Sequence, residues 1–115
     1  MTLESQVTSL ELSRRLAELG IKQESLWYWG RWGKIWELVQ THPNANLDKY
    51  SSFTVAELGE LLPKNEWTTT GSTSDRWIVE YHDFNSQGKV VEAPTEADAR
   101  AKMLIYLIEN KLISV

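Results

Sequence analysis

The residues best suited to catalysis are few, and they do not form a catalytic pattern. The chain has two histidines, His42 and His82, and no cysteine, so thiolate zinc sites, disulfides and cysteine nucleophiles are excluded. A zinc hydrolase site needs three His or carboxylate ligands. The adjacent pair His82-Asp83 is typical of metal phosphohydrolases, but the further histidines that such a site needs are missing. We interpret this pair as a strand end that runs into a polar turn.

The sequence does not indicate other kinds of catalysis either. No Gly-x-Ser-x-Gly nucleophile elbow is present. The segment Gly30-Arg31-Trp32-Gly33 lacks the phosphate-binding pattern and a helix after it. Glu57 and Glu60 could act as a carboxylate pair, but solvated charges on an amphipathic helix explain them better. We therefore expect no catalytic residue, metal site or cofactor, and we predict that the protein is not an enzyme.

Tryptophan is the more informative residue type in this chain. Four of the six tryptophans lie within ten residues, and they are Trp27, Trp29, Trp32 and Trp36. A tryptophan is usually either a large core element or a binding anchor. Three of these four fit strands and are expected to fill the two faces of a hairpin. Trp32 falls in the turn, so we predict that Trp32, with Arg31 and Lys34 beside it, is a partner-binding site.

The cluster lies in a segment that is predicted to be extended. Strand composition or alternation occurs in residues 26–30, 35–39, 76–82 and 89–93. Residues 31–34 and 85–88 are short enough to close two hairpins. One face of the second hairpin carries Trp77, Val79 and Tyr81. Residues 40–53 and 67–74 show little periodicity and are predicted to be loops.

Three helices complete the chain, and each begins at a threonine. Thr8 has Glu11 three residues later, and Thr54 has Glu57, which is capping-box spacing. Gly20 is expected to end the first helix in a left-handed conformation. The last helix begins at Thr95 and has one apolar arc that contains Ala97, Ala101, Leu104, Ile105, Ile108 and Leu112.

A second apolar stripe lies off that arc in the last helix. It consists of Met103, Tyr106 and Leu107. A helix that is apolar nearly all round is either sandwiched between other elements or part of an interface. We predict that this stripe is a partner-binding surface through which the protein self-associates.

The expected order of elements is α-β-β-α-β-β-α. This order predicts a single α+β domain over residues 1–115, with one antiparallel four-stranded sheet and helices packed on it. The first hairpin has apolar residues on both faces. Helices on both faces of the sheet would cover them, so we expect three layers.

Length and charge restrict the choice of partners. A chain of 115 residues with 42% hydrophobic and 24% charged residues is typical of one globular domain. The net charge of −4 repels phosphate backbones, so nucleic acid is not the expected partner. No apolar run is long enough to span a membrane, and no signal peptide is evident. We therefore expect a cytoplasmic protein with no membrane contact.

Three blocks of the sequence carry a family resemblance. LELSRRLAELGI (residues 10–21), FTVAELGELLP (53–63) and EADARAKMLIYLIEN (96–110) occur in this order. Together they resemble a family of small phage and prophage-associated bacterial proteins of unknown function. The resemblance implies a bacterial or phage source and a cytoplasmic location, and no catalytic residues. Residues 76–109 are also similar in pattern to the hairpin–helix unit of HicB-type antitoxins, which bind a toxin through a small sheet.

Two functions of different class stay open. The first is a non-enzymatic protein-interaction module, which binds a protein partner or a second copy of itself. The alternative is a domain that binds a small ligand or single-stranded nucleic acid through Trp29, Arg31 and Trp32.

Overall fold

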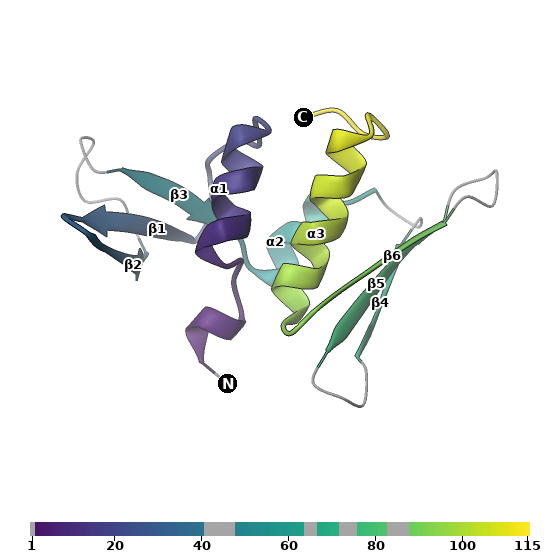
Figure 1. Ribbon diagram of the computed structural model, residues 1–115, viewed down its shortest axis with the longest axis horizontal. Coiled ribbons are helices and arrows are strands. Elements are labelled where there is room, and N and C mark those ends of the chain that lie inside the picture. The colour runs from purple at the N-terminus through teal and green to yellow at the C-terminus, as the bar shows by residue number, and fades with distance from the viewer. Residues whose placement is uncertain (1, 41–47, 64–66, 72–75, 83–87) are drawn as a thin grey trace.

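Two small antiparallel sheets stand at opposite ends of the molecule, with the helices between them (Figure 1). The computed structural model describes residues 2–40, 48–63, 67–71, 76–82 and 88–115. The first sheet has the strand order β2-β1-β3 and contains β1 (Trp27–Trp32), β2 (Ile35–Val39) and β3 (Lys49–Ser52). The second has the order β4-β5-β6 and contains β4 (Trp67–Gly71), β5 (Trp77–His82) and β6 (Gly88–Ala93).

The helices form the middle layer of the molecule. A 3-10 turn, η1 (Leu3–Ser5), precedes α1 (Leu10–Glu18), α2 (Val55–Leu61) follows β3, and α3 (Glu96–Glu109) ends the fold. Helix α1 packs on β3, and α3 packs on β5 and β6 while also contacting α1 and α2 (Figure 1). The α+β class and the predicted α-β-β-α-β-β-α order are therefore present, with two strands added.

The prediction of one four-stranded sheet between layers of helices is wrong. Six strands form two sheets, and the helices lie between the sheets instead of outside them. The two additional strands, β3 and β4, lie in segments that we predicted to be loops. Residues 41–47 and 72–74 of those segments lie outside the described residues, as do 85–87 of the predicted turn before β6.

The capping residues in the sequence predict the helix ends correctly, except at the start of α1. Thr54 and Glu57 form the predicted capping box of α2, and Thr95 caps α3 by accepting from the Asp98 N–H. Helix α1 begins one residue later than predicted, because Ser9 and not Thr8 caps it. Gly20 has the predicted positive φ, 94°, and lets the chain turn after α1.

One hydrophobic core joins the two halves of the chain. Its fully or nearly fully buried members include Leu16 of α1, Phe53 after β3, Leu58 of α2, and Val79 of β5. Helix α3 supplies the largest share because it has neighbours on several sides, and its buried residues are Ala97, Ala99, Ala101, Met103, Leu104 and Leu107. Among the described residues, no helix is both long and apolar enough to cross a membrane. The single domain and the cytoplasmic location stay predictions.

Candidate binding hairpin

The turn Gly33-Lys34 closes the β1–β2 hairpin. Gly33 has a φ of 64°, and no non-glycine residue of this hairpin has a positive φ. Glycine with positive φ at the first of two turn positions is the pattern of a type II′ turn, whose twist matches that of the flanking strands. The turn makes Trp32 and Ile35 the first cross-strand pair. The predicted hairpin is present, and its turn sets the register of β2, but the turn is shorter than the predicted residues 31–34, because Arg31 and Trp32 belong to β1.

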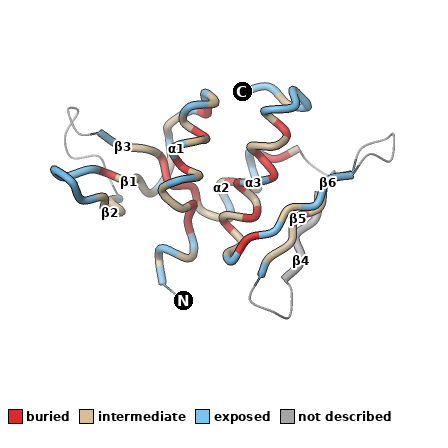
Figure 2. The backbone as a smooth tube through the Cα atoms, viewed as in Figure 1, coloured by how far each residue is buried: buried red, intermediate tan, exposed pale blue. Residues whose placement is uncertain are grey.

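The end of this hairpin is the most exposed apolar part of the first sheet. Trp32 is 48% exposed and Ile35 63% exposed. Because they are cross-strand partners, their side chains lie next to each other on the same face. The hairpin projects away from α1, and the tube of Figure 2 is coloured as exposed along this end. We call residues 32–35 the hairpin tip.

The two basic residues predicted beside Trp32 have different surroundings. The Arg31 guanidinium pairs with the Asp48 carboxylate, and its Cζ lies 5.8 Å from the centre of the Trp36 ring. The Arg31 backbone N–H also donates to the Asp48 carbonyl at 2.9 Å. Lys34 is exposed and forms no ion pair with another described residue. Arg31 is therefore held against the sheet, whereas the charge of Lys34 at the tip is not paired with another described residue.

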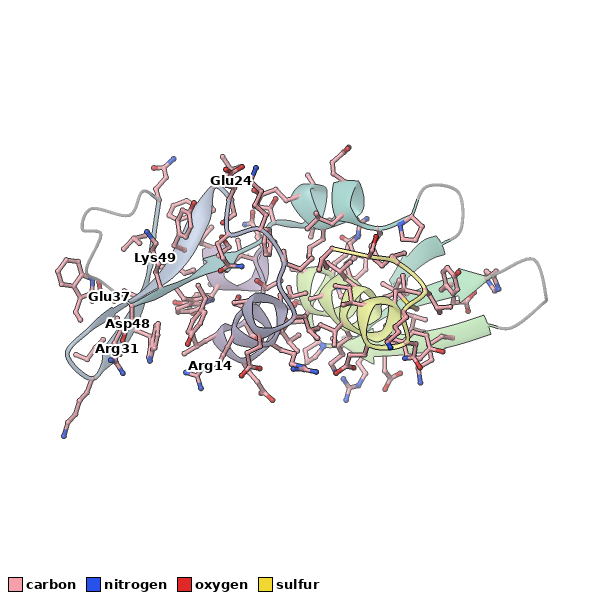
Figure 3. All side chains as sticks on the ribbon, turned by 90° about the horizontal axis from the view of Figure 1, so that it is seen from above. Arg14, Glu24, Arg31, Glu37, Asp48 and Lys49 are labelled. Carbon is pink, nitrogen blue, oxygen red and sulfur yellow. The ribbon has the colours of Figure 1, made fainter. Side chains whose placement is uncertain are left out.

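Aromatic rings and arginines form a stack on the face of the first sheet that is turned toward α1. The Trp36 and Tyr50 rings are stacked, with centres 5.5 Å apart and planes 24° apart. Arg14 of α1 lies over both rings, at 5.9 Å and 5.6 Å. Figure 3 has Arg14 and Arg31 on one side of this sheet and Lys49 on the other. We call Arg14, Arg31, Trp36 and Tyr50 the cation–aromatic stack.

The remaining tryptophans of β1 are largely engaged in the fold. The Trp29 Nε1–H donates to the Thr8 carbonyl at 2.9 Å, which ties β1 to the start of α1. Trp27 and Trp29 are both half-buried. They share one face, as predicted, but no second layer of helices covers the opposite face at the tip. Trp32 is therefore the exposed member of the four-tryptophan cluster.

The two edges of the first sheet differ in how their backbone groups are satisfied. On the outer edge by β3, the Ser51 N–H donates to Gln23 Oε1 at 2.8 Å. Directly after β3, the Phe53 N–H donates to Thr8 Oγ1 at 3.0 Å. The Phe53 carbonyl accepts from the Thr8 N–H at 2.9 Å. Gln23 and Thr8 therefore occupy part of this edge, at Ser51 and just after β3.

The edge by β2 is open. Since Trp32 and Ile35 pair across a two-residue turn, Ile35, Glu37 and Val39 direct their backbone groups toward β1. Trp36 and Leu38 therefore direct their N–H and carbonyl groups away from the sheet. No hydrogen bond between described residues reaches these groups. A cavity of about 380 Å³ lies beside this edge, and it is lined by Thr2, Leu3, Glu4, Trp29, Trp36, Glu37 and Leu38.

The structure does not support the second predicted surface, on α3. Met103 and Leu107 are both 0% exposed, so they belong to the core and do not form a surface stripe. Tyr106 is half-buried, and Lys89 Nζ lies 5.1 Å from the centre of its ring. The prediction of an exposed stripe is wrong because α3 is sandwiched between α1, α2 and the second sheet.

The groove beside Tyr106 carries mixed charge. Its volume is about 360 Å³, and α1 and α3 line it with Glu11, Leu12, Arg14, Arg15, Glu18, Lys102, Ile105, Tyr106 and Glu109. Arg15 and Glu109 bridge the two helices at 2.5 Å, and this contact raises the pKa of Arg15. Both ends of the pair are exposed to water, so it adds little to stability.

The residues considered for catalysis have structural surroundings. Glu57 accepts from the Thr54 N–H at 2.9 Å and from the Leu26 N–H at 3.0 Å, so it ties α2 to the start of β1. His82 is exposed and lies 3.4 Å from Glu80. His42 and Asp83 lie outside the described residues. Within the part of the chain that the structure describes, no three His, Asp or Glu side chains are grouped as metal ligands.

Comparison with known proteins gives no further assignment. No protein-family model, curated protein or solved structure matches the chain. The candidate site therefore rests on the geometry of the first sheet.

Proposed function

We propose that this protein acts by binding another polypeptide chain and performs no catalysis itself, with the β1–β2 hairpin as its contact surface. The observation that carries this proposal is the exposed Trp32–Ile35 pair at the projecting hairpin tip. Aromatic anchors flanked by basic side chains are the residue types on which protein interfaces depend most. Here the anchor is presented by a turn whose geometry Gly33 fixes, so little conformational freedom is lost on binding.

Single-stranded nucleic acid fits this surface less well than a protein does. Such binders use several open aromatic rings along a positively charged groove. Of the aromatic rings on the first sheet, Trp36 is already in contact with Arg14, Arg31 and Tyr50. Asp48 neutralises Arg31, which leaves Lys34 as the charge at the tip without an ion pair among described residues. One open ring and one free lysine favour a protein contact.

Site-specific photo-crosslinking in living cells tests the proposal. A photoreactive residue is placed at position 32 in the full chain, and at position 90 as a control, because Val90 is 57% exposed but lies on the second sheet. We expect one defined protein, which can be a second copy of this chain, to crosslink from position 32 and not from position 90. The same products from both positions, or none from position 32, would contradict the proposal.

A further inference from the structure

The open edge of β2 has a sequence that is nearly symmetric about its central residue. β2 reads Ile-Trp-Glu-Leu-Val, with Glu37 in the middle and apolar residues at the four other positions. A strand of this kind can pair with itself in antiparallel fashion. Residue 35 then lies opposite residue 39 of the second strand, residue 36 opposite residue 38, and residue 37 opposite itself.

We propose that two copies of this chain associate through their β2 edges in this register and form one continuous six-stranded sheet, β3-β1-β2-β2-β1-β3. The inference rests on the proposed function, because it names a second copy as the bound polypeptide. A two-fold axis through the Glu37 pair relates the copies, as closed dimers of identical chains require.

Backbone geometry allows this register without remodelling. Trp36 and Leu38 carry the outward-directed N–H and carbonyl groups, and these residues lie opposite each other in the proposed pair. They therefore form two equivalent sets of hydrogen bonds, one on each side of the axis. A register shifted by one residue would place Trp36 opposite Glu37, whose backbone groups already bond to β1, and would lose these bonds.

Side chains support the same arrangement. Ile35, which is 63% exposed, is covered by Val39 of the second copy. Trp36 and Leu38 of each copy meet beside the cavity that they line. On β3 the outward-directed Ser51 N–H is already bonded to Gln23, whereas no described residue bonds the outward-directed groups of Trp36 and Leu38 on β2. Five residue pairs form a small contact, so the dimer is weak and its formation depends on protein concentration.

One contact in the dimer is unfavourable, and it identifies the register. Glu37 faces Glu37 across the axis, and directly opposed like charges destabilise a strand pair. Lys49 lies on the same face, across Gly30 in the same row of the sheet, which moderates the repulsion. If the two strands were shifted by two residues in either direction, Glu37 would face Ile35 or Val39 of the second copy instead of Glu37. Charge changes at position 37 therefore distinguish the proposed register from its neighbours.

Sedimentation equilibrium on the full chain, from about 10 µM to about 1 mM, measures the dimer directly. We expect reversible dimerisation of the wild type. Glu37→Gln removes the repulsion and should strengthen association by up to about fivefold. A wild type that stays monomeric throughout this range would overturn the inference, as would a Glu37→Gln variant that associates more weakly.

A mixing experiment tests the register. Native mass spectrometry of equal amounts of isotope-labelled wild type and unlabelled Glu37→Lys should show mixed dimers as clearly more than half of all dimers, the share that random pairing gives, because opposite charges then face each other across the axis. Glu60→Lys is the matched control, since Glu60 is exposed on α2, away from β2, and the net charge change is identical. Equal enrichment of mixed dimers with both variants would reject the register.

The edge itself is tested by Leu38→Pro. Proline removes an N–H that points outward, so the hydrogen bonds between β2 and β1 are kept. We expect at least about tenfold weaker association. If the variant does not fold, amide exchange on the wild type replaces it: the Trp36 and Leu38 N–H groups should become protected as concentration rises. Crosslinks from position 32 to a different protein, with a monomeric wild type, would retain the proposed function and reject this inference.

Discussion

The two sheets contain the same number of strands but use their apolar residues in opposite ways. In the second sheet, Val79 and Tyr81 are buried and Trp77 packs against the core, beneath α3. In the first sheet, α1 packs on β3 and reaches Trp36 of β2 through Arg14, and the hairpin tip extends beyond it (Figure 1). A sheet whose apolar face is covered contributes to stability. A sheet whose apolar residues stay exposed is available for binding.

The edge strands β6 and β2 also differ in how well they are protected from pairing with another chain. Strand β6, one edge of the second sheet, carries the charged residues Lys89 and Glu92. The Glu92 carbonyl accepts from Lys102 Nζ of α3 at 3.0 Å. Charged side chains of this kind protect an edge strand from pairing with another chain. Strand β2 has one charged residue, Glu37, so the β2 edge is less protected than the β6 edge.

The largest expected effect is a difference in unfolding free energy between a core variant and a variant of the exposed hairpin. Leu107→Ala, on the buried face of α3 between the helices and the second sheet, should lower the free energy of unfolding by about 2–5 kcal/mol. Trp32→Ala should change it by less than about 0.5 kcal/mol, because the side chain has few contacts to lose. Urea denaturation measures both variants. Equal losses of stability would contradict the division between a packing sheet and a binding sheet.

Features set by neighbours in sequence were predicted correctly in both halves of the molecule. The alternation of Trp77, Val79 and Tyr81 gave the correct buried face of β5, and Thr95 with Asp98 gave the correct start of α3. These features depend on neighbours in sequence. The prediction that Trp32 lies in the turn is wrong, because Trp32 ends β1, but the prediction that it is exposed is confirmed.

Features that depend on distant contacts were missed. β3 reads Lys-Tyr-Ser-Ser and has little apolar pattern. It is held by hydrogen bonds to residues distant in sequence: the Ser52 Oγ–H donates to the Thr8 carbonyl at 2.8 Å, and the Ser51 backbone N–H donates to Gln23 Oε1. β4 is rich in threonine, which suits strands as well as loops. The burial of Met103 and Leu107 required knowing that α3 would be sandwiched. Two sheets instead of one follow from these same missed strands.

The second-largest loss of stability is expected at Thr8, which binds the chain directly after β3. Thr8→Val removes the acceptor for the Phe53 N–H and the partner of Ser13 Oγ, which lies 2.6 Å away. Leaving buried polar groups without partners should cost about 1–3 kcal/mol of unfolding free energy. Thr8→Ser retains the hydroxyl and is the control.

The outcome separates hydrogen bonding from packing at this edge. Thermal denaturation should show Thr8→Ser to be clearly more stable than Thr8→Val. If Thr8→Val were as stable as the wild type, the hydrogen bonds of Thr8 Oγ1 would not contribute to this edge.

A smaller effect is expected where α3 meets the start of α1. Asp98 accepts from the Ser9 N–H at 2.8 Å, and burial raises the pKa of its carboxyl above the ordinary value of 3.8. The folded chain therefore holds this proton more tightly than the unfolded chain. Folding gains from this group as the pH falls through the folded pKa toward 3.8, and the gain is lost as the pH rises again.

Asp98→Asn keeps an acceptor for Ser9 but cannot ionise. The stability of the wild type relative to this variant should therefore increase as the pH falls from neutral to about 4. Asp98→Ala also loses the acceptor and should cost about 1 kcal/mol at neutral pH. Urea denaturation at both pH values measures the difference. A constant difference between wild type and Asp98→Asn would contradict the burial of this charge.

The smallest effect compares one cation–aromatic contact from each sheet. Arg14 lies over two rings of the first sheet, Trp36 and Tyr50, whereas Lys89 of the second lies over Tyr106 alone. Replacement by methionine keeps much of the aliphatic stem and removes the charge. Arg14→Met should cost about 1 kcal/mol and Lys89→Met about 0.5 kcal/mol, because all these sites are partly exposed to water. No measurable loss for Arg14→Met would mean that the first sheet does not depend on its cation–aromatic stack for stability.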